Sequence, residues 1–217
     1  MSTTPGPRRL LPSPRQLVLL VVGCVVLGVG VGLLLAADLG SDGYSTLVYG
    51  TSLALGVPFA VANLGIGVLF VGLAALRRVV PGLGTVVQVV LVGLVVSWAL
   101  ELLAVPDAWW QQGLLLAAAF PVLALGIAAY LGSQTGAGPT EAMALAWDPP
   151  VPFRWSYSLV QGGGALVGWL CGATVGLGTL AVIALLGPGV DLAARVLRVD
   201  VHQPAPGEPA GGARGDS

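Results

Sequence analysis

Apolar positions along the chain gather into six long segments and two short ones. The long segments lie near residues 17–37, 58–76, 85–103, 113–132, 155–173 and 178–194. Each is close to the ~20 apolar residues that a helix needs to cross a hydrocarbon layer of ~30 Å. The short segments, 44–56 and 139–147, would reach only about 20 Å and about 14 Å as helices, so neither crosses alone. The pattern predicts an all-α polytopic membrane protein with six transmembrane helices and two short re-entrant helices.

The composition agrees with a protein that lies in a lipid bilayer. Hydrophobic residues make up 56% of the chain and charged residues only 9%, whereas soluble domains carry roughly 25% charged residues. The 33 glycines fit the same class, because helices in lipid approach closely through small residues. The net charge of −1 provides no basic field for a nucleic acid.

The arginines predict how the chain is oriented. All nine positively charged residues are arginine. With six spans and a cytoplasmic N-terminus, all nine fall on the cytoplasmic side, where positive charge is enriched in membrane proteins. If both short segments crossed instead, Arg77 and Arg78 would lie outside. We therefore expect both termini in the cytoplasm, with Tyr44 and Trp147 as aromatic residues of the membrane interface.

Short identical motifs recur at a nearly constant distance along the chain. VPF occurs at 57–59 and at 151–153, and GLGT at 82–85 and at 176–179, each pair 94 positions apart. Upstream, Gly40 and Gly136 are 96 positions apart. The ordered offsets indicate a duplication in which each half contributes three spans and one short helix. Because three is odd, the halves must insert in opposite orientations, and inverted repeats with interrupted helices are typical of transporters.

The duplication also sets the expected organisation of the chain. We predict a cytoplasmic N-terminal tail (1–16), a first membrane repeat (17–104), an outer loop (105–112), a second membrane repeat (113–197) and a cytoplasmic C-terminal tail (198–217). The last tail is rich in proline and glycine and is expected to be disordered.

Two glycine-rich breaks, GSDGYS at 40–45 and GAGPT at 136–140, precede the short helices. Non-helical backbone at membrane depth is tolerated only where protein or a water-filled cavity satisfies it. Gly136 and Gly138 suit positive φ, and Pro139 suits the first turn of a helix. That helix start could hold an anion on its free N–H groups, or Glu141 in its first turn could satisfy the helix dipole itself.

Polar groups in and beside the breaks are the candidate site for a solute or ion, because polar residues inside a membrane are costly. The candidates at the breaks and short helices are Glu141, Gly136, Gly138, Thr140, Ser45 and Asp42. Two further candidates lie elsewhere: Gln161, deep in a long segment, and Asp191, after the GPG at 187–189.

Structural roles are the alternative for several polar residues. Gln161, Gln88 and Asn63 could each form a hydrogen bond between helices. Asp191 could pair with Arg195, four residues further on, or relay protons.

Three stretches of the chain resemble the YczE/YyaS/YitT-like bacterial integral membrane proteins. They are ADLGSDGYSTLVYGTSLALGVPF, LGSQTGAGPTEAMALAW and GWLCGATVGLGTLAVIALLGPGVDLAARVL, and the resemblance covers roughly residues 17–197. Gly136, Gly138, Pro139 and Glu141 match a Gly-x-Gly-Pro-x-acid signature.

Further matches and one departure complete the resemblance. Gly176, Gly178 and Thr179 match a second, Gly-x-Gly-Thr signature. Gly43 and Ser45 depart from the first-half pattern, where proline and a polar or acidic residue are usual. The resemblance implies a multi-pass protein of the bacterial plasma membrane and brings no defined activity.

Sequence motifs for catalysis or for a cofactor are missing. The chain has one histidine and no nucleophile elbow, zinc-protease or phosphate-loop motif, and no clustered metal ligands. Cys24 and Cys171 lie in apolar runs and are expected to be free, buried thiols. We therefore expect no enzyme, metal or cofactor. The leading hypothesis is a small-solute transporter or permease, acting as a homodimer, and the alternative is a membrane protein that scaffolds or regulates a secretion or biosynthetic system.

Overall fold

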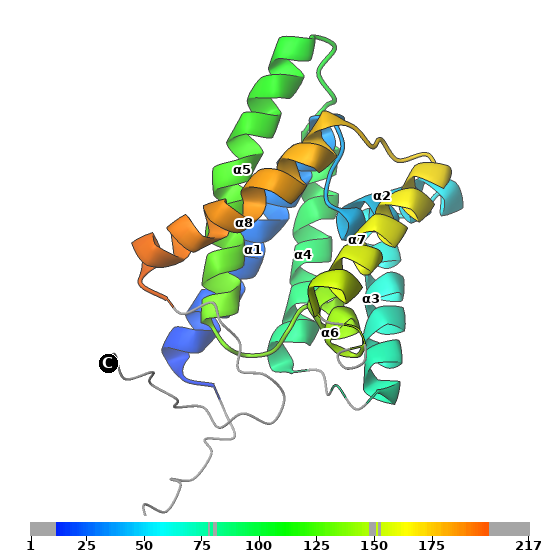
Figure 1. Ribbon diagram of the computed structural model, residues 1–217. Coiled ribbons are helices and arrows are strands. Elements are labelled where there is room, and N and C mark those ends of the chain that lie inside the picture. Colours follow the sequence, from blue (N-terminus) through cyan, green and yellow to red (C-terminus); the bar gives the residue numbers. More distant parts are fainter. Residues whose placement is uncertain (1–11, 78, 80–81, 148–150, 152, 200–217) are drawn as a thin grey trace, which may run out of the picture.

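The computed structural model describes residues 12–77, 79, 82–147, 151 and 153–199, and the regular secondary structure of this part is helical (Figure 1). The predicted tails, 1–16 and 198–217, lie mostly outside it. The helices are α1 (Pro14–Ala36), α2 (Gly43–Leu55), α3 (Phe59–Leu76), α4 (Leu83–Leu102), α5 (Trp109–Gly132), α6 (Pro139–Leu145), α7 (Phe153–Leu170) and α8 (Leu177–Leu197). They match the six long and two short predicted segments, which confirms the all-helical fold.

Four helices, α1, α3, α4 and α5, are long and apolar enough to cross a membrane. The two halves of α8, Leu177–Leu186 and Pro188–Leu197, qualify together as a fifth although they are bent by 48°. Proline inside a helix removes one N–H and crowds the preceding turn, which accounts for a bend at this place. The chain is thus an integral membrane protein, and its described part contains four or five helices long and apolar enough to cross a membrane. α7 falls outside this set.

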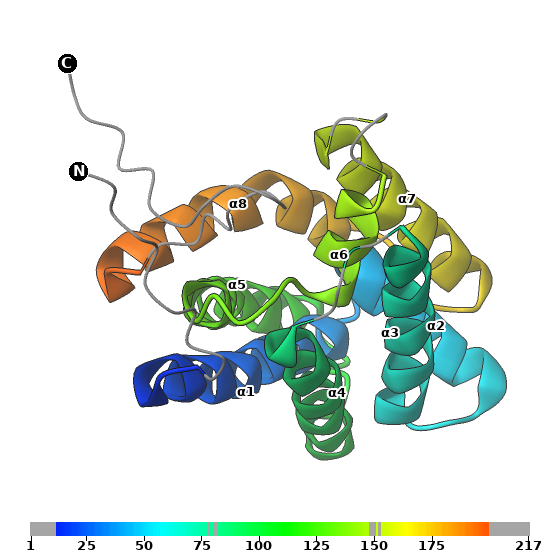
Figure 2. The same cartoon turned by 90° about the horizontal axis from the view of Figure 1, so that it is seen from below.

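The helices form two groups of four, seen side by side in Figure 2. In the first group, α1 packs against α4 and α5, and α5 packs against α8. In the second, α2 packs against α3 and α7, and α6 packs against α3 and α7. Contacts between α3 and α4 join the two groups. The largest buried apolar cluster lies along this junction and includes Leu27, Val48, Phe59 and Leu123.

Glycine lets several helices approach backbone to backbone. A Cβ on Gly50 of α2 would overlap the carbonyl oxygen of Gly168 on α7. A Cβ on Gly23 of α1 would lie 2.5 Å from the backbone nitrogen of Tyr130 on α5. These contacts show the small-residue packing that helices in lipid favour.

Each GLGT motif starts a long helix and contacts the break of the other half. The Gly84 N–H donates a 3.0 Å hydrogen bond to the Thr135 carbonyl, and the Gly178 N–H donates one of 2.7 Å to the Leu39 carbonyl. The two breaks also share a left-handed backbone, with φ of 98° at Gly40 and 143° at Gly136.

Replacing Gly50 with alanine tests the close packing of α2 on α7. We expect Gly50→Ala to lower the free energy of unfolding by about 1–3 kcal/mol, because the added methyl group must push two backbones apart. Thermal unfolding of the detergent-solubilised protein, followed by tryptophan fluorescence, measures the change.

The matched control is Gly65→Ala on α3, where an added Cβ meets no atom within 4 Å. Alanine is the better helix former, so this variant should be unchanged or more stable by up to about 1 kcal/mol. Equal losses in both variants would contradict the packing explanation.

Candidate functional site

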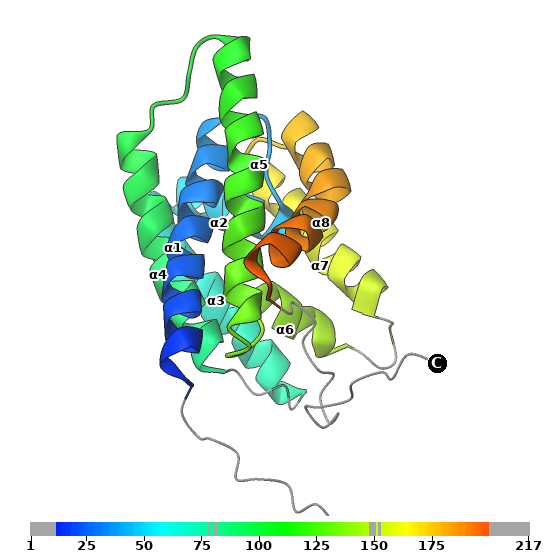
Figure 3. The same ribbon diagram turned by 90° about the vertical axis from the view of Figure 1, so that its left-hand side faces the viewer.

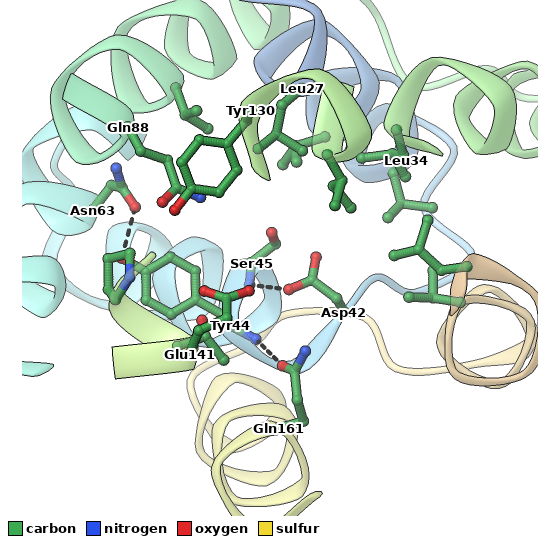
Figure 4. A pocket seen from close by; sticks show the side chains of 18 of the residues that line it. Leu27, Leu34, Asp42, Tyr44, Ser45, Asn63, Gln88, Tyr130, Glu141 and Gln161 are labelled. Atoms are coloured by element: carbon green, nitrogen blue, oxygen red, sulfur yellow. Dashed lines mark hydrogen bonds between the residues drawn. The ribbon is translucent and has the colours of Figure 1, made fainter. Parts of the chain in front are cut away.

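A cavity of about 110 Å³ lies between the two helix groups (Figure 4). All eight helices, together with the residue that caps α2, contribute side chains to its wall. A single buried water needs only about 10–15 Å³ measured in this way, so the cavity has room for several waters or one small solute.

The wall has a polar side and an apolar side. The polar lining residues are Asp42, Tyr44, Ser45, Asn63, Gln88, Tyr130, Thr140, Glu141, Tyr157 and Gln161. The apolar side is formed mainly by aliphatic residues of α1, α4, α5 and α8, such as Leu27 and Val182. An apolar wall with a few converging polar groups is the usual character of a small-molecule site.

The start of α2 is fixed at the cavity by hydrogen bonds to two other helices, one of which is bonded in turn to a third. Asp42 caps α2, its Oδ2 accepting from the Ser45 N–H at 3.0 Å. The Tyr44 N–H donates to Oε1 of Gln161 on α7 at 2.9 Å. The Tyr44 hydroxyl donates to Oδ1 of Asn63 on α3 at 3.0 Å, and Nδ2 of Asn63 donates to the Val89 carbonyl on α4 at 2.6 Å. The tyrosine side chain is therefore held against the wall of the cavity.

The start of α6 is held on the other side of the cavity. The Tyr130 hydroxyl of α5 donates to the Gly136 carbonyl at 2.9 Å, and the Thr85 hydroxyl of α4 donates to the Ala137 carbonyl at 2.6 Å. Gly138 is the N-cap and Pro139 the first residue of α6, which places Glu141 in the first turn. These bonds satisfy carbonyl groups of the break and direct the first turn of α6 toward the cavity.

Glu141 and Gln88 meet at Gly138. A Cβ on Gly138 would lie 2.5 Å from Oε1 of Gln88 and would overlap Oε2 of Glu141. Oε1 of Gln88 is buried and has no hydrogen-bond partner in the described chain. An unpaired buried acceptor costs about 1–3 kcal/mol. The cavity thus presents an acceptor that a donor group of a ligand or water would satisfy.

The charged groups of the wall are both carboxylates. Asp42 comes from the break before α2 and Glu141 from α6, and in Figure 4 both point into the space between the helices. The wall contains no arginine, lysine or histidine among the described residues. The described chain also holds no group of three or more histidine, cysteine, aspartate or glutamate side chains that could bind a metal.

Comparison with known proteins gives the family. Residues 14–195 match a family described as a family of unknown function, DUF6198. The chain belongs to DUF6198. It is 23% identical over 194 residues to a protein of Haemophilus influenzae titled "Uncharacterized protein", covering 88% of each chain. No solved structure matches. The match supports membership of DUF6198, whereas the YczE/YyaS/YitT-like name is still only a resemblance.

The structure brings most of the predicted site residues of this DUF6198 protein together. Five of them line the cavity: Asp42, Ser45, Thr140, Glu141 and Gln161. Gly136 and Gly138 shape the break beside it. The prediction of positive φ is correct for Gly136 and wrong for Gly138, whose φ is −65°. A Cβ on Gly138 would instead meet the side-chain ends of Gln88 and Glu141, which would have to shift to make room for it.

The structure places Asp191 elsewhere. It is exposed on α8 and is not part of the cavity wall. The face of α8 that packs inward carries Val190, Ala193 and Ala194, which are buried with Ala124 of α5. Successive helical residues point about 100° apart, so Asp191 projects away from that face.

Sequence reasoning missed three tyrosines of the DUF6198 site. Tyr44 was expected at the membrane interface, and the structure instead places it on the cavity wall, hydrogen-bonded to Asn63. Tyr130 and Tyr157 were not expected there at all. For Tyr157 the spacing of the repeats was the available signal. It lies 94 positions after Asn63, the offset that relates the two halves, and both residues line the cavity.

The roles expected for the side-chain amides have mixed outcomes. Asn63 and Gln161 do bond between helices, as expected. The expectation is wrong for the Gln88 oxygen, which has no partner.

The wall of the cavity does not favour the hypothesis of an anion bound at the start of α6. Two carboxylates, Asp42 and Glu141, line the same cavity, and no basic side chain lies in the described wall. Like charges repel, so the wall disfavours an anion.

Thiol labelling tests whether this cavity holds water. Ser45→Cys and Thr140→Cys place a thiol on the wall from each short helix, and we expect both to react with a small water-soluble methanethiosulfonate. Thr46→Cys, next along α2, should stay unreactive, because Thr46 is fully buried and does not line the cavity.

The background for this experiment must lack Cys24 and Cys171, which are free, Cys24 being buried and Cys171 partly exposed. Mass spectrometry of the purified protein counts the added groups. Protection of Ser45→Cys and Thr140→Cys to the level of Thr46→Cys would contradict a water-filled cavity.

Proposed function

We propose that this DUF6198 protein is a small-solute transporter of the bacterial plasma membrane, and not an enzyme. One observation carries the proposal: the short helices α2 and α6, each preceded by a break, both begin at one cavity, and all eight helices contribute to its wall. Irregular backbone inside a membrane is tolerated where it lines such a cavity. Transporters place their substrate sites at discontinuous helices of this kind, between structural repeats.

The helix contacts support two repeats related by exchange of α1, α2, α3 and α4 with α5, α6, α7 and α8. The contact of α1 with α4 corresponds to that of α5 with α8. The contact of α2 with α7 corresponds to that of α6 with α3, and α2 with α3 corresponds to α6 with α7. The exchange maps each of these contacts onto another, whereas the contact of α3 with α4 has no comparable counterpart between α7 and α8 in the described chain.

The backbone of the breaks supports the same relation. Asp38 and Gln134, 96 positions apart, have φ of 52° and 51°, although neither is glycine. The hydrogen bond from Gly84 to Thr135 and that from Gly178 to Leu39 join corresponding residues with the halves exchanged. Matched contacts favour a duplication over chance recurrence of glycine-rich sequence.

The direction of the helices favours an inverted relation. In Figure 3 the chain runs upward through α1 and α4 and downward through α5 and α8. In Figure 1 it runs downward through α3 and upward through α7. Each long helix of one half therefore runs opposite to its counterpart, which supports two inverted repeats of three spans, with α7 and α8 as the last two of six.

The carboxylates indicate that the cavity is functional. A charged residue at the centre of a membrane helix costs about 2.5–3.5 kcal/mol on insertion scales. Asp42 has a structural use, since it caps α2. Glu141 is next to an acceptor with no partner, on the wall of a hollow space. Such an arrangement adds nothing to packing and suits the transient binding of a solute.

Transport can be tested with the purified protein in liposomes. The uptake of three radiolabelled probes is compared: tetramethylammonium, erythritol and malonate, one from each charge class. We expect uptake of at least one probe above that of empty vesicles, and Glu141→Gln should reduce it by at least about tenfold, equivalent to ~1.4 kcal/mol of lost interaction.

The matched control is Glu101→Gln, which removes the same charge from an exposed glutamate in the last turn of α4. Its uptake should equal that of the unmodified protein. No uptake of any probe, together with co-purification of a stoichiometric partner protein, would instead favour the scaffold or regulatory alternative.

Reporter fusions test the six-span topology. We expect a fusion at residue 79 to report the cytoplasm and a fusion at residue 107 to report the outside. A truncation fused at residue 174, after α7, should again report the outside. A cytoplasmic signal at residue 174 would show that α7 does not cross, and would overturn the inverted repeat.

The orientation has structural support at its cytoplasmic end. The guanidinium carbon of Arg77 lies 4.4 Å from the ring centre of Trp147. This cation–π pair joins the C-cap residue of α3 to the residue that follows the C-cap of α6. Both segments therefore end at one membrane face, which six spans with an arginine-rich inside require.

A further inference from the structure

We infer that the solute bound in the cavity is a small organic cation, a protonated amine or quaternary ammonium ion. The inference rests on the proposed function, because it names the substrate class of the same cavity. It is carried by the carboxylates, the unpaired acceptor and the aromatic groups of the wall.

The charge of the wall is unbalanced. Asp42 and Glu141 reach the cavity from different short helices, and no basic side chain lines the described wall with them. Two carboxylates in a low-dielectric site are unfavourable unless a positive charge or a proton compensates them. A cationic solute supplies that charge, and a neutral or anionic solute does not.

The acceptors of the wall suit an ammonium group. The cap of α2 occupies Oδ2 of Asp42 and leaves its other oxygen for a ligand. Oε1 of Gln88 has no donor, and it lies at Gly138 beside Oε2 of Glu141. A primary ammonium group offers three N–H donors and no acceptor, so these oxygens can accept from it. A quaternary ammonium ion has no N–H and would be held by the charge of the carboxylates and by the aromatic residues.

The aromatic residues distinguish an organic cation from a metal ion. Tyr44, Phe59, Tyr130 and Tyr157 line the cavity together with aliphatic side chains. Aromatic faces attract organic cations, and the aliphatic wall accepts an alkyl group. A hard metal ion needs about six or more oxygen ligands, and no group of three metal-binding side chains is present in the described chain.

The size of the cavity limits the solute. About 110 Å³ admits a molecule of a few non-hydrogen atoms, since a single water needs about 10–15 Å³ by the same measure. Propylammonium and tetramethylammonium fit this description, and large polyamines or lipid-like cations do not.

Equilibrium binding tests the charge class independently of transport. The purified full-length protein in detergent is titrated calorimetrically with propylammonium and tetramethylammonium, in a buffer without amines. The comparisons are 1-propanol and propionate, which have similar size but are neutral and anionic, and sodium chloride, which tests for a metal cation. We expect binding of at least one ammonium probe and none of the three comparison compounds.

Two variants connect binding to the carboxylates. Glu141→Gln and Asp42→Asn should each weaken the affinity for the ammonium probe by at least about tenfold, because each removes one negative charge from the wall of the cavity. Asparagine is also a good N-cap, so Asp42→Asn keeps the start of α2 intact. The matched controls, Glu101→Gln and Asp107→Asn, change exposed carboxylates and should bind like the unmodified protein.

The outcomes separate this inference from the proposed function. The inference of an organic cation is overturned if propionate or 1-propanol binds, or if neither ammonium probe binds. It is also overturned if sodium binds in place of both ammonium probes. Unchanged affinity in both variants overturns it as well, once gel filtration shows that the variants are folded. Ammonium binding without uptake into liposomes supports the inference and counts against transport. Uptake of erythritol or malonate without ammonium binding supports transport and counts against an organic cation as the solute.

Discussion

The structure depends on satisfying broken backbone where no water is available. Each break before a short helix leaves carbonyl groups that a membrane interior cannot bond. The helix that begins with GLGT in the opposite half supplies the donor, from Gly84 to Thr135 and from Gly178 to Leu39. A glycine is needed at these places because a Cβ on Gly84 or Gly178 would overlap the opposite break. The breaks and the GLGT motifs are therefore two parts of one interaction.

Once the breaks are held, the position of the cavity follows. α2 and α6 begin inside the bundle, so their first turns face the space between the two helix groups. Hydrogen bonds from Tyr44 to Gln161 and Asn63 then link the start of α2 to α7 and α3. The polar wall is thus part of the interactions that join the helices, and the helices keep these polar groups facing the cavity and away from lipid.

The order of the helices and both breaks could be predicted from the sequence, because apolar length, glycine and proline act locally. The five candidate residues that line the cavity lie at the breaks or deep within a long helix, where a polar residue stands out from its apolar neighbours. The tyrosines were missed because tyrosine is common at membrane interfaces, and only packing shows that Tyr44 lies inside. The unpaired oxygen of Gln88 depends on how α4 meets Gly138, which no local pattern contains. Asp191 stands out in the sequence as an acidic residue in an apolar segment, but the sequence does not show on which face of α8 it lies.

The two halves provide similar frames and different chemistry. Ser45 and Glu141 occupy corresponding positions in the first turns of α2 and α6, and Asn63 and Tyr157 correspond on α3 and α7. If the wall served packing alone, small apolar residues in both halves would fill the space at lower cost, since buried polar groups require partners. The frame is conserved between the halves where backbone bonding demands it, at the breaks and the GLGT motifs. It differs where side chains face the cavity, which gives the proposed solute site two unlike sides.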